Sequence, residues 1–130
     1  MTSTPPEAAA TQGPDVPPDG DQRPVDVETI RASIAEAHRL RGLAATDAEL
    51  LDVTAALRGH IAVLLPDVQA ATDELWHGSL EWSRRSGRLS GIRAQCDQKV
   101  GAGKLASYVQ VNQLQRDCEW LLTDYEARQK

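Results

Sequence analysis

The sequence predicts an all-α protein: an antiparallel bundle of three to four helices that follows a disordered N-terminal tail. Two observations support this prediction. No stretch alternates apolar and polar residues in the manner of a half-buried strand. In the middle of the chain, apolar residues instead recur every seven positions in two interleaved series, as in a helix packed among neighbours. The first series is Leu50, Leu57, Leu64 and Ala71, and the second is Thr54, Ile61, Val68, Leu75 and Trp82.

The first 25 residues differ in composition from the rest of the chain. Six of the seven prolines lie within the first 24 residues, and large apolar side chains are almost lacking there. Such a segment cannot bury enough surface to offset the entropy lost on ordering. We therefore predict a disordered tail over residues 1–25 and one helical bundle domain over residues 26–130.

The net charge of -5 is concentrated near the N-terminus. Residues 1–30 contain six acidic residues and one arginine, whereas residues 31–130 contain thirteen acidic and thirteen basic residues. A neutral domain argues against nucleic-acid binding, which needs a strongly basic surface. The chain has no apolar run long enough for a membrane span and no secretion signal at its start, so we expect a cytoplasmic protein.

The ends of the first two helices are marked by capping residues. Asp26 can cap a first helix, and Gly42 can end it. Thr46 and Glu49 have the spacing of a capping box, which predicts the start of a central helix that reaches about Leu65. The apolar face of the first helix is formed by Val27, Ile30, Ile34 and Ala37. Leu51 and Leu65 widen the apolar stripe of the central helix, so we expect it to contact more than one neighbour.

Pro66 is expected to bend the chain and to begin a further helix, because it lacks the N–H that a helix interior needs. One long helix from Pro66 to Val100 is the first prediction, and a break near Gly78 is the alternative. A last helix is predicted from about Lys104 to Ala127. Its apolar face is formed by Val111, Leu114, Cys118, Leu121 and Tyr125.

The short turn around Ala102 predicts how the last two helices face each other. Residues equally distant from this turn lie at the same level of an antiparallel pair, which places Trp120 beside Arg84 and near Trp82. Cys96 and Cys118 are offset by ten residues, or about 15 Å along a helix, so we expect no disulfide between them.

Arg58, Gly59 and His60 are the candidate residues for a ligand pocket. Glycine in a helix interior usually indicates close approach of another backbone or of a ligand. The alternative is that Gly59 admits a neighbouring helix while His60 lies half-buried at the edge of the apolar stripe.

Glu74 and His77 have a spacing that occurs in helical di-metal sites, but such sites need the motif twice. It occurs once here, so we expect no metal site and no cofactor.

The only basic cluster contains Arg84, Arg85, Arg88 and Arg93, joined by Lys99 and Lys104. It can bind phosphate or an acidic partner, or it can form an ordinary solvated surface in which Glu81 pairs with Arg85.

Leu105, Val109 and Trp120 form a second apolar stripe on the last helix. Either the first helix covers this stripe, or it is a docking surface for a partner.

Three segments resemble those of a family of small uncharacterised actinobacterial proteins, found mainly in streptomycetes and linked to natural product biosynthesis. They are LRGHIAVLLPDV at 57–68, LEWSRRSGRLSGIR at 80–93 and LASYVQVNQLQRDCEWLL at 105–122. The resemblance covers residues 46–127. It implies an accessory role in biosynthesis or its regulation, and it identifies no catalytic residue.

No nucleophile motif, phosphate-binding glycine loop or helix-turn-helix signature is present. We therefore expect a non-enzymatic protein that acts by binding another protein or a second copy of itself. The alternative is a small-molecule-binding or enzymatic bundle with a pocket near Arg58 and His60.

Overall fold

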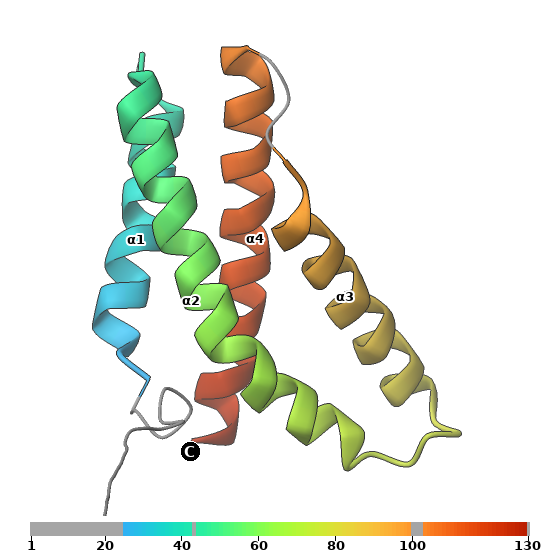
Figure 1. The fold of residues 1–130 in the computed structure, drawn as a ribbon. Helices are drawn as coiled ribbons and strands as arrows, with labels where there is room; N and C mark the ends of the chain where they lie inside the picture. Colours follow the sequence, from blue (N-terminus) through green and yellow to red (C-terminus); the bar gives the residue numbers. More distant parts are fainter. Residues whose placement is uncertain (1–24, 43, 100–102, 130) are drawn as a thin grey trace, which may run out of the picture.

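The computed structural model describes residues 25–42, 44–99 and 103–129, and within them it contains four helices and no strand. These are α1 (Val27–Arg41), α2 (Asp47–Asp73), α3 (Leu80–Asp97) and α4 (Lys104–Arg128). Consecutive helices run in opposite directions (Figure 1). The all-α prediction is confirmed. The predicted tail lies outside the described residues, apart from Val25.

Helix starts follow the predicted capping chemistry. The Asp26 carboxylate accepts a hydrogen bond from the Thr29 backbone N–H at 3.1 Å. At the start of α2, the Thr46 hydroxyl accepts from the Glu49 N–H, and the Glu49 carboxylate accepts from the Thr46 N–H. These interactions satisfy N–H groups that the first helical turn leaves free.

Helix α2 continues through Pro66 and ends at Asp73, so the prediction that Pro66 begins a new helix is wrong. The predicted bend is present, since the C-terminal part of α2 turns away from the line of its N-terminal part (Figure 1). The prediction of one long helix from Pro66 is also wrong, and the alternative break near Gly78 is confirmed. Ser79 caps the new helix by accepting from the Trp82 N–H at 3.0 Å.

Helices α1, α2 and α4 supply most of the core, and α2 lies against all three other helices. The predicted apolar faces of α1 and α4 are buried, with Val27 and Tyr125 at the edge. In α2, Leu65 packs against the core as predicted, but Leu51 does not widen the buried stripe, because it is 63% exposed. The largest fully buried apolar side chains are Ile30, Leu40, Leu50, Leu57, Ile61, Leu64, Val68, Leu89, Ile92, Leu114 and Leu121.

Helix α3 buries only Leu89 and Ile92, and its N-terminal half diverges from α4 (Figure 1). Its C-terminal end is held by hydrogen bonds. The Gln98 carbonyl accepts from the Arg58 guanidinium at 2.7 Å and from the Gln110 side-chain amide at 3.1 Å.

The turn before α4 is only partly described, and Ala102, its predicted centre, lies outside the described residues. Gly103 has a φ of 91°, which is unfavourable for residues with a Cβ. Both cysteines are free. None of the four helices combines the length and apolar character that a membrane crossing requires.

Candidate functional site

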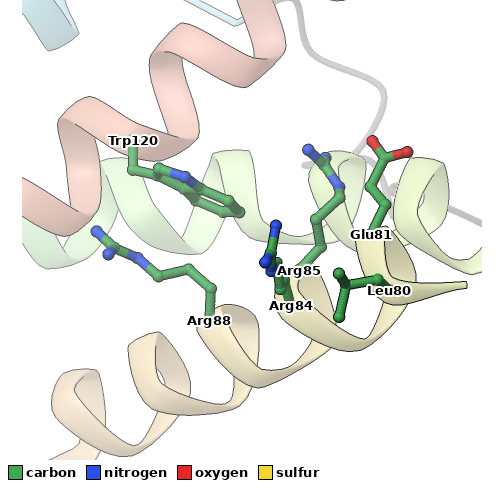
Figure 2. A pocket seen from close by; sticks show the side chains of 6 residues that line it. All are labelled: Leu80, Glu81, Arg84, Arg85, Arg88 and Trp120. Atoms are coloured by element: carbon green, nitrogen blue, oxygen red, sulfur yellow. The ribbon is translucent and has the colours of Figure 1, made fainter.

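The candidate site is a groove between the diverging α3 and α4, with a volume of about 360 Å³. Figure 2 shows that five of the lining side chains come from the start of α3 and the sixth from α4. We call it the arginine–tryptophan groove. Its lining residues are Leu80, Glu81, Arg84, Arg85, Arg88 and Trp120. The helical spacing explains this set, because positions three and four apart lie on one face of α3.

Trp120 lies between two of the arginines. Its ring centroid is 5.6 Å from the Arg85 guanidinium carbon and 5.3 Å from that of Arg88 (Figure 2). Both distances fall within the range of cation–π attraction. The predicted level of Trp120 beside Arg84 is confirmed, since both line the groove. Trp82 has another neighbour, because its ring stacks on His77 with centroids 4.6 Å apart.

Arg85 is fixed by residues of two other helices. Its guanidinium lies 2.7 Å from the Asp124 carboxylate and donates to the Thr72 hydroxyl at 3.2 Å. The predicted pair between Glu81 and Arg85 is therefore replaced by a pair with Asp124 in the described structure. The Arg85 and Asp124 side chains are only 20% and 16% exposed, which shields their interaction from solvent.

Arg88 and Arg84 are more accessible. Arg88 lies 3.6 Å from the Asp117 carboxylate, and the Arg88 side chain is 42% exposed. Burial raises the pKa of Asp117, although hydrogen bonding from Gln113 and the charge of Arg88 oppose this. Arg84 is exposed and makes no ion pair with any residue that the structure describes. The groove therefore contains one guanidinium group without a counter-charge.

The second apolar stripe is not covered by α1. Helix α1 contacts another side of α4, where Arg31 pairs with Glu126. Trp120 is half-buried against α3, whereas Leu105 and Val109 are 78% and 61% exposed. The predicted docking residues thus share one side of α4, with Trp120 inside the groove and the other two on the open helix surface.

Arg58, Gly59 and His60 do not converge on one site. Side chains two positions apart on a helix point about 200° apart. Accordingly, Arg58 reaches Gln98 beyond α3, while His60 lies 2.8 Å from the Ser33 hydroxyl of α1. A Cβ on Gly59 would meet no atom of another part of the described chain within 4 Å, so no helix packs closely there. The ligand pocket predicted from these residues stays a prediction.

A second pocket, of about 320 Å³, lies between α1 and α2. Glu36, Glu49 and Asp52 line it, together with Ser33. Burial lowers the pKa of the neighbouring His60, an effect that the charge of Asp26 partly opposes. The imidazole is thus favoured in its neutral form, in which it shares one hydrogen bond with Ser33.

Glu74 and His77 lie at the end of α2 and in the following turn. Glu74 is the C-cap of α2, and the His77 ring lies 3.2 Å from the Asp73 carbonyl oxygen. The described part of the chain has no group of three or more side chains arranged to hold a metal ion.

The sequence matches a protein family along almost its whole length. The sequence profile of a family of unknown function, DUF6415, matches residues 8–130, which is nearly the entire chain. The chain belongs to this family. No curated protein and no solved structure matches it.

The DUF6415 match extends further towards the N-terminus than the resemblance noted in the sequence, which begins at residue 46. Most of the acidic N-terminal segment is thus included in the family match.

Sequence reasoning overlooked two residues of this DUF6415 protein that shape the groove, Asp117 and Asp124. They stand seven positions apart, which places them on one face of α4, opposite Arg88 and Arg85. The available signal was that both the acidic pair and the basic pair lie on one face of their helix. Their detection required knowing that these two faces meet.

Proposed function

We propose that this protein is a non-enzymatic helical protein that binds a partner protein through the arginine–tryptophan groove and the adjoining surface of α4. The observation that carries the proposal is the composition of the groove, in which three arginines surround one partly exposed tryptophan. Tryptophan and arginine are the residues most enriched among the anchors of protein interfaces.

Apolar side chains extend this surface on both sides of Trp120. Leu80 is 64% exposed at the rim of the groove, and Leu105 and Val109 are exposed further along α4. The distance from Leu105 to Trp120 along the helix is about 22 Å, or four turns. An amphipathic helix of the partner matches this length, with apolar residues towards α4 and an acidic residue near Arg84.

The ionisable groups in the groove favour binding over catalysis. Arginine stays protonated in proteins, so Arg84, Arg85 and Arg88 cannot act as general bases at physiological pH. Glu81 is the one carboxylate among the lining residues. Fixed positive charges and an indole are suited to holding a carboxylate and an apolar side chain.

The cellular context of this proposal comes from the resemblance. We infer an accessory role in natural product biosynthesis or its regulation, in the cytoplasm of an actinobacterium. Self-association through the same surface is the competing form of the proposal, since Leu105 and Val109 are exposed in the single chain.

The test is a capture experiment followed by a direct affinity measurement. The full chain serves as bait in an extract of its host, and a captured protein is purified and titrated by calorimetry. Trp120→Ala and Arg84→Glu are each expected to weaken binding about 30-fold, which corresponds to about 2 kcal/mol. Arg93→Glu is the matched control, because nine positions place Arg93 on the opposite face of α3.

Equal affinity of the wild type and all three variants would contradict the proposal. Light scattering tests the competing form. A wild-type dimer that Trp120→Ala converts to a monomer would assign the surface to self-association.

A further inference from the structure

We propose that the acidic N-terminal segment of this chain, residues 1–24, binds in the arginine–tryptophan groove and thereby blocks it. The segment lies outside the described residues, and its sequence, length and point of attachment support this assignment. The competition with a partner rests on the function proposed above, whereas the binding of the segment itself does not.

Charge complementarity is the first argument. The segment contains four acidic residues and one arginine, so its side chains have a net charge of -3. Arg85 and Arg88 of the groove pair with Asp124 and Asp117, whereas Arg84 is exposed and has no ion pair among the described residues. Opposite charges of this kind attract and orient the two surfaces.

The sequence of the segment matches the chemistry of the groove more specifically. Asp15 and Asp19 flank Pro17 and Pro18. Proline pairs favour the extended polyproline II conformation, which packs against aromatic side chains in grooves and loses little entropy on binding. We assign the two prolines to the Trp120 ring and the flanking carboxylates to Arg84 and Arg88.

The point of attachment allows this contact. Early in α1, Arg31 pairs with Glu126 of α4, and two positions earlier on α4 Asp124 pairs with the groove residue Arg85. The segment therefore begins at the groove end of the bundle, on another side of α4. A helix is about 10 Å wide, and the chain extends about 3.3 Å per residue. The six residues from Val25 to Asp19 span up to about 20 Å, and the ten to Asp15 span up to about 33 Å, enough to pass around α4.

The family match includes most of the segment as well as the groove. It begins at residue 8, so all the residues that we assign to the groove lie within it.

The test compares the wild-type full chain with the triple variant Asp15→Asn, Asp19→Asn, Asp21→Asn by NMR. The expected result is a change in the indole N–H signal of Trp120 and in the guanidinium Nε signals of Arg84 and Arg88. The indole signal of Trp76, which is 77% exposed and lies outside the groove, is the internal control. High salt should abolish the difference, because it screens exposed charges.

A matched control variant removes the same number of carboxylates elsewhere. This control is the triple variant Asp52→Asn, Glu74→Gln, Asp97→Asn. It alters exposed residues that form no ion pair among the described residues, and it should leave the groove signals unchanged. Identical groove signals in the wild type and the Asp15, Asp19, Asp21 variant would overturn the proposal. A difference that grows with protein concentration would also overturn it, since the segment of a second copy would then occupy the groove.

Partner affinity separates this inference from the proposed function. If the segment fills the groove nine-tenths of the time, the triple variant binds the partner about tenfold more tightly than the wild type. A change in the NMR signals together with unchanged partner affinity would support binding of the segment to the groove. It would contradict the proposal that the partner binds there.

Discussion

Helices α2 and α4 each bury eight side chains, whereas α3 buries two. The core therefore belongs to α1, α2 and α4. Helix α3 is attached mainly by the Arg85–Asp124 pair, the bonds to the Gln98 carbonyl and two apolar side chains. Five of the six residues that line the groove nevertheless come from α3. The comparison shows that stability and the candidate binding surface reside in different parts of the molecule, so mutations can separate them.

The largest expected effect is in the core. Leu57 is fully buried in α2, and Leu57→Ala should lower the free energy of unfolding by about 2–5 kcal/mol. Leu51→Ala, six positions earlier on the exposed face, should change it by less than about 0.5 kcal/mol. Urea denaturation followed by far-UV circular dichroism measures both. Equal losses for the two variants would contradict the assignment of the core.

A smaller and more local effect is expected for the anchor of α3. Ile92→Ala removes one of two buried side chains of α3 and should lower the protection of its amides in hydrogen exchange by about 2–3 kcal/mol. Amides in the middle of α2 and α4 should lose less protection. Equal loss in all four helices would show that α3 unfolds only with the whole domain.

Two adjacent arginines provide the next comparison. Arg85→Ala leaves the 16% exposed Asp124 carboxylate with Arg128 as its remaining partner and should destabilise the domain by about 1–2 kcal/mol. Arg84→Ala should leave stability within about 0.5 kcal/mol of the wild type, because no described residue pairs with Arg84. Thermal denaturation of both variants tests this. Similar melting temperatures would mean that the Asp124 pair contributes nothing.

The smallest effect concerns pH. Because burial lowers the pKa of His60 in the folded state, the unfolded chain takes up this proton first as the pH falls. The contribution of His60 is present above its unfolded pKa of 6.5 and is lost as the pH falls through the lower folded value. The urea midpoint is measured at one pH above this range and at one pH below it. The decrease between the two should be larger for the wild type than for His60→Gln. An identical pH dependence would exclude this contribution.

The features that depend on local sequence could be predicted, and those that depend on the meeting of distant faces could not. The caps at Asp26 and Thr46 and the buried face of α4 are local and were correct. The break after Asp73 is the less favoured prediction from the sequence, because the apolar period continues through Leu75 and Trp82 and such a period does not indicate where a chain reverses direction. Ser79, a good cap, was the overlooked signal.

In the candidate site too, features set by local sequence could be predicted, and contacts between distant segments could not. The turn register placed Trp120 level with Arg84, but it did not indicate that α3 diverges from α4 at this level. Arg58 and His60 are neighbours in sequence, yet their side chains contact different helices. The partner of Arg85 was predicted to be Glu81, four positions away, because the competing carboxylate of Asp124 lies on another helix.

Pro66 has a consequence for how this binding surface can vary. Because its ring removes one hydrogen bond inside α2, the helix bends and carries the start of α3 away from α4 (Figure 1). Pro66 thus contributes to the separation of α3 and α4 at the groove, although it does not line the groove. Pro66→Ala should therefore change the geometry of the proposed binding surface while every lining side chain stays the same.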